Sequence, residues 1–257
     1  MSDTAHSERI LDQFTRQAPA FSAAAMITDD TVLAMIVERA GASASDTMLD
    51  VACGPGIVVC AFAPHVRHAT GIDFTAAMLD RARALAAEKD LHNVAWDQGD
   101  AYSLPYPDGS FSIVATRYSL HHLLDPAAAL REMVRVCAPG GRIVVVDAYA
   151  SEDPIKAAAF HRVEVLRDPS HARSLSLTEL RELFPRIGLP EPHLTLYELH
   201  VGLEELLARA FPDPGDLEEI RATFNAAADD DRLGMPVRRE GDSIDIAYRA
   251  AILVAER

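Results

Sequence analysis

Short apolar runs alternate with amphipathic stretches through the first 150 residues of the chain. The apolar runs have the length of strands and cover residues 47–52, 68–73, 94–100, 110–116 and 141–149. The stretches with helical spacing cover residues 5–17, 30–40, 57–63, 74–89 and 126–137. Strands that alternate with helices predict an α/β fold, a doubly wound parallel sheet with right-handed connections.

The clearest of these patterns lies between residues 126 and 149. Apolar residues at i, i+3, i+4 and i+7 form one helix face. They are Leu130, Met133, Val134 and Cys137. The Ala-Pro-Gly-Gly sequence that follows is a stop signal for this helix. The run 141–149 is then continuously apolar, which is typical of a parallel strand covered on both faces.

After residue 150 the alternation breaks down. Helices are expected over residues 153–166, 176–187, 203–210 and 216–231. Strands are expected over residues 193–201 and 244–256. The sheet should therefore combine residues 45–150 with two late strands, and the other segments should cover one end of it. Residues 213–231 hold seven acids and one arginine, which we interpret as a solvated face rather than a metal site.

Composition and charge narrow the possible functions. The chain has 257 residues, of which 49% are hydrophobic and 25% charged, as in globular proteins. We expect one domain over residues 1–257. With 24 basic and 39 acidic side chains the net charge is −15. Nucleic acids and anionic membranes attract basic surfaces, so this balance argues against nucleic acid as a partner.

Cysteine usage and hydropathy bear on where the protein works. The three cysteines, Cys53, Cys60 and Cys137, include no Cys-x-x-Cys pair, so neither a disulfide framework nor a zinc ribbon is expected. A reducing cytoplasm fits best. No apolar run approaches the ~18–20 residues that span a bilayer, and the N-terminal sequence lacks the apolar core of a signal peptide.

A glycine loop and three aspartates are the first candidates for chemistry. Gly54 and Gly56 follow the first predicted strand, in the sequence LDVACGPG. Asp50, Asp73 and Asp100 end three successive predicted strands, so they should line one crevice. Asp73 is spaced like a carboxylate that receives ribose hydroxyls, and Asp100 is placed to accept from an exocyclic amine. Each aspartate alone could be a helix cap, but the three together indicate a nucleotide-like ligand.

The details of the loop favour one such ligand over another. Val59 stands where the third glycine of the Gly-x-Gly-x-x-Gly dinucleotide fingerprint should be, which argues against an NAD-dependent oxidoreductase. Carboxylates at positions 50 and 100 also suit a diphosphate poorly. They suit S-adenosylmethionine (SAM), which carries an ammonium, ribose hydroxyls and an adenine amine but no phosphate.

Four motifs carry a resemblance to a known family: LDVACGPG (49–56), GIDFTAAML (71–79), GDAYSLPYPDGSFSIV (99–114) and LREMVRVCAPGGRIVVVD (130–147). On these motifs the chain resembles class I SAM-dependent methyltransferases of the type-11 domain group, which includes the ubiquinone and menaquinone C-methyltransferases. The resemblance implies a Rossmann-like sheet of order 3-2-1-4-5-7-6, with the last strand antiparallel, and a helical lid. It also implies a SAM-binding core at 45–150, an N-terminal lid at 1–44 and a substrate cover with the last two strands at 151–257.

The resemblance also implies which residues bind the cofactor. Asp73 would hold the ribose hydroxyls, and Asp100 and Ala101 the adenine. The glycine loop would lie under the methionine part, with Ala52 where many members have glycine. The full expected set is Phe21, Asp50, Ala52, Gly54, Gly56, Asp73, Phe74, Asp100, Ala101 and Arg117.

Candidates for the methyl-transfer site follow the fourth predicted strand. Transfer from a sulfonium is an in-line displacement in which the protein mainly supplies geometry and desolvation. A base is needed only when the acceptor atom carries a proton of high pKa. Tyr118 is a candidate for substrate binding, and His121 and His122 for such a base. The alternative is that the two histidines cap the next helix or pack in the loop.

A second polar cluster lies on and after the helix that follows residue 153. His161 and His171 are the candidates there for proton removal, and Glu164 and Arg167 for substrate binding, with Arg167 suited to a carboxylate. The functional interpretation is a polar pocket wall. The alternative is a solvated helix face held by salt links.

The predicted function is therefore methyl transfer from SAM to a small-molecule acceptor. A sensor or partner protein that binds SAM or S-adenosylhomocysteine (SAH) without transferase activity is the alternative. No ligand spacing indicates a metal, and no motif of amino-methylating nucleic-acid enzymes is present. The expected oligomeric state is a monomer or a homodimer.

Overall fold

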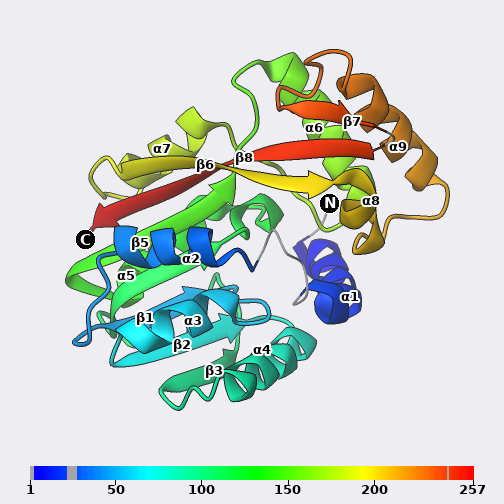
Figure 1. Ribbon diagram of the computed structural model, residues 1–257. Helices are drawn as coiled ribbons and strands as arrows, with labels where there is room; N and C mark the ends of the chain where they lie inside the picture. Colours follow the sequence, from blue (N-terminus) through cyan, green and yellow to red (C-terminus); the bar gives the residue numbers. More distant parts are fainter. Residues whose placement is uncertain (1–2, 22–27, 242) are drawn as a thin grey trace.

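The strands form one mixed sheet. The computed structural model describes residues 3–21, 28–241 and 243–257, with the side chains of residues 3 and 19–21 outside the description. Its strand order is β3-β2-β1-β4-β5-β8-β6, and β7 pairs with β8 (Figure 1). The strands are β1 (Thr47–Val51), β2 (His68–Asp73), β3 (Val94–Gln98), β4 (Phe111–Arg117), β5 (Cys137–Ala148), β6 (His193–Gly202), β7 (Val237–Glu240) and β8 (Ser243–Glu256).

Pairing within the sheet is parallel from β3 to β5 and antiparallel beyond it. Strands β1, β2, β3, β4 and β5 pair in parallel, whereas β8 runs antiparallel to β5, β6 and β7. The predicted order, with the last strand inserted antiparallel beside the fifth, is thus confirmed. The short strand β7 was not predicted.

Helices cover both faces of this sheet. In chain order they are α1 (Asp3–Phe21), α2 (Asp30–Arg39), α3 (Ile57–Phe62), α4 (Ala76–Glu88), α5 (Pro126–Val136), α6 (Pro154–Arg167), α7 (Leu177–Arg186), α8 (Leu203–Ala208) and α9 (Asp216–Ala227). Short 3₁₀ turns lie at Ala63–His65 (η1) and Leu120–His122 (η2). Among the described residues, no helix combines the length and apolarity needed to cross a membrane.

Alternate strand residues point to opposite faces, and this divides the core into two layers. Met48 and Val144 pack in the layer built with α2 and α3, whereas their neighbours Leu49 and Val145 pack in the layer built with α5 and α7. These strands are buried on both faces, which explains why they read as continuous apolar runs.

A third apolar cluster forms a cap at one end of the sheet. There α6, α8 and α9 pack on the ends of β6 and β8 that lie farthest from α7. Phe160, Leu206 and Phe224 are among its buried residues. Helix α1 lies at the same end of the molecule (Figure 1). This end is also where β1, β2 and β4 finish, so helices surround the carboxyl ends of the strands.

Several boundaries differ from the expected ones; for example, the first helix ends at Phe21 rather than at residue 17. β5 begins at Cys137, four residues earlier than expected, because Cys137 pairs with Phe111 before a register shift in the ladder. The helix expected over 216–231 ends at Ala227. Asp229, Asp230 and Asp231 follow it as exposed turn residues.

Candidate active site

The glycine loop after β1 has an unusual backbone. Ala52, Gly54 and Gly56 all have positive φ, of 57°, 53° and 78°. For an L-residue such as alanine the left-handed conformation costs roughly 1–2 kcal/mol. The loop therefore holds strain at Ala52 before Gly56 caps the N-terminus of α3.

The two glycines of the loop are needed for different reasons. A Cβ at Gly56 would lie 2.4 Å from Cη2 of Trp96 on β3, so the indole packs directly on the loop backbone. A Cβ at Gly54 would meet nothing within 4 Å. Gly54 thus faces open space, and Gly56 is buried behind the loop.

Asp73, at the end of β2, ties two loops together. Its Oδ2 accepts the Gly54 N–H at 2.8 Å, and its Oδ1 accepts the Thr75 N–H at 2.8 Å. Burial raises the pKa of Asp73, and these two backbone donors act in the opposite direction. A carboxylate has about four acceptor positions, so the same group can still accept hydrogen bonds from a ligand.

Asp50 and Arg117 bring a buried carboxyl group and a buried guanidinium group together at the ends of β1 and β4. Asp50 is 1% exposed, and its Oδ1 has no hydrogen-bond partner among the described residues. Burial raises the pKa of Asp50 well above its usual value, while the positive charge of Arg117 acts to lower it. The Arg117 guanidinium also lies over the ring of Tyr118, 4.5 Å from its centroid.

Asp100 is the exposed member of the three aspartates. Its Oδ1 accepts the Tyr102 N–H at 2.9 Å, which fixes the turn after β3. The Tyr102 hydroxyl in turn accepts the Asp125 N–H at 3.2 Å. The turn therefore presents Asp100 and Ala101 together at the end of the strand.

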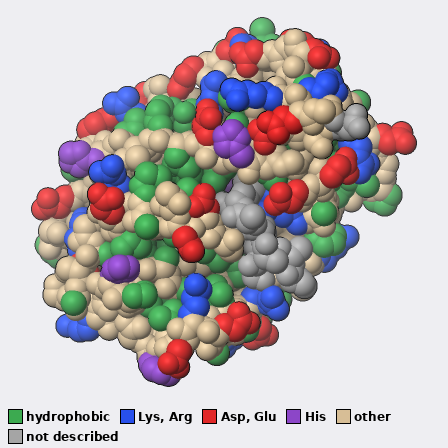
Figure 2. Space-filling view, viewed as in Figure 1, with side chains coloured by type: hydrophobic (Ala, Val, Ile, Leu, Met, Phe, Trp, Pro, Cys, Tyr) green, Lys and Arg blue, Asp and Glu red, His purple; other side chains and the backbone are tan. Residues whose placement is uncertain are grey.

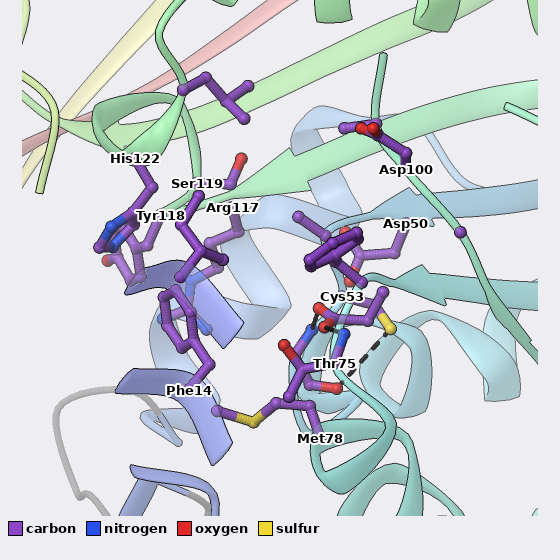
Figure 3. Close-up of a pocket in the computed structure, with 18 of the residues that line it drawn as sticks. Phe14, Asp50, Cys53, Thr75, Met78, Asp100, Arg117, Tyr118, Ser119 and His122 are labelled. Atoms are coloured by element: carbon purple, nitrogen blue, oxygen red, sulfur yellow. Dashed lines mark hydrogen bonds between the residues drawn. The ribbon is translucent and has the colours of Figure 1, made fainter. Parts of the chain in front are cut away.

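These groups line one cavity, which we call the first cavity (Figure 3). Of the residues expected to bind the cofactor, eight line it: Asp50, Ala52, Gly54, Asp73, Phe74, Asp100, Ala101 and Arg117. Gly56 supports the loop from behind, and the side chain of Phe21 lies outside the described ones. The first cavity has further walls that were not among the expected cofactor residues. They include Ser7, Ile10 and Phe14 of α1, and Cys53, Thr75, Met78 and Ser119.

A second cavity adjoins the first. Phe14, Tyr118 and His122 line both, so these three side chains form the boundary between them. Tyr118 has φ of 53°, a strained conformation for a bulky residue, which turns the chain at the end of β4. The second cavity has apolar walls from Phe160, Leu199 and Leu206. Its polar walls are Gln17, His121, Glu164, Arg167, Asp168, His171, Ser174, Arg209 and Tyr248.

The four candidate histidines come together beside this cavity. The rings of His121 and His122 have centroids 4.3 Å apart, and His171 stacks on His121 at 5.4 Å with 29° between the planes. His161 lies 5.6 Å from His171. His161 is half-buried and does not line the second cavity, whereas the other three histidines do.

Each histidine has its own electrostatic environment. Burial lowers the pKa of His121, but the adjacent Asp147 outweighs it and the pKa is raised. Burial and the neighbouring His121 lower the pKa of His122 to about 4. Burial, with its histidine neighbours, also lowers the pKa of His171 far below its ordinary value. His122 and His171 are therefore neutral at pH 7.

The polar partner of His121 was not predicted from the sequence. Asp147, near the end of β5, is 1% exposed, and its Oδ1 lies 2.6 Å from Nδ1 of His121. Its Oδ2 accepts the Leu120 N–H at 2.9 Å. The available signal was topological: β4 and β5 are neighbours, so residues just after β4 must meet the end of β5.

Glu164 and Arg167 do not lie on a solvated face. They form an ion pair at 2.7 Å in which Glu164 is 3% exposed, and the Tyr248 hydroxyl donates to Glu164 Oε1 at 2.9 Å. The solvated salt links of α6 instead join Arg162 to Glu219 of α9 and Lys156 to Asp231. Glu164 and Arg167 thus contribute a paired, buried wall of the second cavity.

Helix α1 covers both cavities and is held by buried polar contacts. His6 Nε2 lies 2.6 Å from the backbone carbonyl oxygen of His122. Gln17 Nε2 donates to Asp168 Oδ2 at 3.0 Å, and Gln13 Nε2 to the carbonyl of Phe211 at 3.0 Å. Within the described part of the chain, no group of histidine, cysteine or acidic side chains is arranged to hold a metal ion.

Comparison with known proteins agrees with this architecture. Residues 49–145 match a family model described as a methyltransferase domain. The chain is 33% identical over 248 residues to YcgJ of Bacillus subtilis, an uncharacterized methyltransferase, covering 93% of this chain and 98% of YcgJ. It is also 40% identical over 103 residues to a demethylmenaquinone methyltransferase of Listeria monocytogenes, covering 39% of this chain and 44% of the enzyme.

Solved structures give the same result. The crystal structure of YcgJ superposes with a TM-score of 0.81 at 32% identity, covering 88% of this chain and 97% of YcgJ. A putative methyltransferase of Bacillus halodurans superposes with a TM-score of 0.80 at 26% identity, covering 87% of this chain and 97% of the other. The chain therefore belongs to the class I methyltransferases, which use S-adenosylmethionine as the methyl donor.

Proposed function

We propose that the protein binds SAM in the first cavity and methylates a small molecule held in the second. The observation that carries this proposal is the shared boundary of Phe14, Tyr118 and His122, which leaves two adjoining spaces in one covered site. An in-line displacement needs the acceptor atom aligned with the methyl carbon and the leaving sulfur, so the two sites must adjoin and water must be excluded.

The residues of the first cavity fit the chemical groups of SAM. Asp73 can still accept hydrogen bonds from ribose hydroxyls. Asp100 and Ala101 are placed at the end of β3 to bind adenine. The buried carboxyl group of Asp50 and the guanidinium group of Arg117 are suitable partners for the ammonium and the carboxylate of a methionine end. Gly54 gives that end room beside the loop. When bound there, SAM supplies an electrophilic methyl group, and the protein orients the acceptor and excludes water.

The second cavity provides the acceptor site in this proposal. His121, Glu164, Arg167 and His171 line it, and Tyr118 stands at its boundary with the first. Such buried and mutually bonded polar side chains favour a transferase over a SAM-binding sensor, which needs no second polar space. His122 is fixed by its contact with Ser170, at 3.1 Å from Nδ1 to the backbone oxygen, and we propose a structural role for it.

Helix α1 acts as a lid in this account. It contributes walls to both cavities, whereas α2 packs in the sheet core. Hydrogen exchange should therefore slow in residues 4–18 when SAH binds and stay unchanged in α2. If α1 exchanged at the same rate with and without SAH, the proposed lid role of α1 would be wrong.

The net charge and the cysteines bear on the class of acceptor and on the cellular compartment. Acidic and basic side chains are interspersed on the face seen in Figure 2, and the net charge is −15. Both disfavour nucleic acid as the acceptor. Cys53, Cys60 and Cys137 are free and buried, which supports work in a reducing cytoplasm.

The experiment that tests the proposal is a release assay for SAH. The protein is incubated with SAM and sets of phenols, thiols, amines, carboxylic acids and quinone precursors, and SAH is quantified. Release that depends on one acceptor class supports the transferase. Tight SAH binding without release for any class would support the sensor.

A further inference from the structure

We infer that His121 is the general base of the reaction, positioned by Asp147, and that its acceptor is an uncharged molecule with a weakly acidic hydroxyl group. This inference rests on the proposed function and deepens it. The structural basis is the contact between His121 Nδ1 and Asp147 Oδ1 at the wall of the second cavity.

The contact fixes which nitrogen of His121 can accept a proton. An ionised carboxylate only accepts hydrogen bonds, so Nδ1 carries the hydrogen and donates it to Asp147. Nε2 is then the basic nitrogen. It has no hydrogen-bond partner among the described residues, while the ring lines the second cavity.

The backbone holds His121 rigidly in this position. Its carbonyl oxygen accepts the N–H groups of Ala172 at 2.8 Å and Arg173 at 3.0 Å. The N–H of the preceding Leu120 is bonded to the second oxygen of Asp147. Base, orienting carboxylate and backbone thus form one connected unit, as a positioned base requires.

The other histidines lack this arrangement. Nδ1 of His122 is engaged by Ser170, and its pKa is held near 4. His171 contacts Ser174 through Nε2 at 3.5 Å, and no carboxylate bonds to it in the described part of the chain. His161 lies outside the cavity wall. His121 is the one of the four with an orienting carboxylate.

The charge balance of the second cavity favours an uncharged acceptor. Its walls hold two basic side chains, Arg167 and Arg209, and two acidic ones, Glu164 and Asp168. Asp147 does not line the cavity; it lies behind the wall, where its two oxygens bond to His121 Nδ1 and the Leu120 N–H. A charged acceptor would leave an uncompensated charge in a buried space, which is costly. The apolar side chains Phe160, Leu199 and Leu206 suit the body of a neutral molecule.

The proton and electron balance is simple. The acceptor hydroxyl gives its proton to Nε2 of His121, and its oxygen forms a bond to the methyl carbon as the bond from that carbon to sulfur breaks. The products are a methyl ether, SAH and a protonated His121 that returns its proton to water. Carboxylates have no proton to give near neutral pH, and neutral amines need no base to attack. Thiols already form a few per cent of strongly nucleophilic thiolate at pH 7, so they depend least on a base.

Several charged groups set the proton affinity of His121. Asp147 faces it from β5, Glu164 and Arg167 from α6, and His122 and His171 from the adjoining turns. Activity should therefore follow the unprotonated fraction of His121, falling on the acid side. Loss of the Asp147 charge should move that acid limb to lower pH.

The test uses two variants that preserve shape. In His121→Asn the amide nitrogen replaces Nδ1 as donor to Asp147, but nothing replaces Nε2. Asp147→Asn removes the charge and keeps the size. The matched controls are His200→Asn and Asp245→Asn, because these residues form a similar pair on the surface, with Nδ1 to Oδ2 at 3.0 Å.

SAH release is first measured for the intact protein with uncharged phenols and enols, and with carboxylates, amines and thiols. We expect turnover with the hydroxyl compounds. His121→Asn should lower kcat at least about 100-fold with SAH affinity within about twofold of the wild type, a margin near 0.4 kcal/mol. The surface controls should keep full activity.

A spectroscopic measurement needs no acceptor. Histidine ¹⁵N spectra should show His121 protonated at Nδ1, titrating above 6.5, and Asp147→Asn should lower that pKa together with the acid limb of kcat. If the acid limb of the kcat profile stayed at the same pH in Asp147→Asn, Asp147 would be only a structural residue and its proposed role would be overturned.

The remaining outcomes separate the inference from the proposed function. Turnover only with carboxylates, amines or thiols would overturn the inference while the transferase stands, as would full activity of a folded His121→Asn. SAH binding without turnover in any class would overturn it and favour the sensor. Absence of SAH binding would reject the proposed function itself.

Discussion

The ring of Phe14 lies edge-on to that of His122, with centroids 4.9 Å apart and 74° between their planes. Phe14 comes from the covering helix α1, and His122 from the η2 turn after β4. Because both line both cavities, an aromatic contact between α1 and the η2 turn forms part of the boundary between the first and the second cavity. The walls of both cavities are thus complete only when α1 is in place.

Replacing Phe14 should therefore affect both spaces. Phe14→Ala removes apolar surface worth about 1.5–3 kcal/mol when fully buried, and it admits water to the reacting atoms. We expect SAH affinity to fall about tenfold and turnover to fall further. Leu11→Ala on the same helix is the control, because Leu11 is 43% exposed. Equal effects of the two substitutions would contradict the boundary role of Phe14.

Alanine substitutions at the two loop glycines should have different effects on stability and on SAH binding. Gly56→Ala pushes a methyl group into Trp96, so it should destabilise the apo protein by more than the ~1–2 kcal/mol of left-handed backbone strain alone. Gly54→Ala carries only that strain, but its methyl group enters the space beside the loop. Thermal unfolding with and without SAH separates the two.

The expected pattern is a large loss of Tm for Gly56→Ala in the apo state. For Gly54→Ala the apo Tm should fall less, and the rise in Tm on adding SAH should be reduced. If Gly54→Ala kept the full stabilisation by SAH, the methionine end of the cofactor would not lie at this loop.

Acid stability should report the neutral state of His122. Its pKa is about 4 in the folded protein and about 6.5 when unfolded. Between these values the unfolded chain binds more protons, so the free energy of unfolding must fall as pH falls from 6.5 towards 4. The loss attributable to His122 is about 2 kcal/mol at pH 5.

The variant His122→Asn keeps a donor towards Ser170 and removes the titration. Urea unfolding at pH 7 and pH 5 should show a smaller loss of stability for this variant than for the wild type. The raised pKa of His121 acts with the opposite sign, but it is present in both proteins. Identical losses in the two would contradict the neutral, buried state of His122.

Much of the fold was predictable because its signals are local. The glycine loop, the alternating runs and the stop before β5 each lie within a few residues of the element they define. Strand β7 was missed because Val237 alone of its four residues is buried, so no alternation marks it. The start of β5 was missed because its Pro-Gly-Gly sequence signals a turn, while the ladder to Phe111 is a long-range contact.

The site was predictable where strands end and unpredictable where distant elements meet. Asp50, Asp73 and Asp100 converge because parallel strands finish at one edge. Asp147 appeared in the sequence only as the end of an apolar run, and its pairing with His121 depends on the β4–β5 neighbourhood. The docking of α1 depends on buried contacts such as Gln17 with Asp168, which no local pattern encodes.

A calorimetric titration of SAH into the wild type, Asp73→Ala and Asp80→Ala tests most directly whether the first cavity is the cofactor site. Asp80 is an exposed aspartate of α4 paired with Arg83, and serves as the charge control. A lost charged hydrogen bond costs about 1.5–3 kcal/mol, so Asp73→Ala should bind SAH roughly 10- to 150-fold more weakly while Asp80→Ala binds normally. SAH binding of unchanged affinity in a folded Asp73→Ala protein would contradict the assignment of the first cavity as the cofactor site.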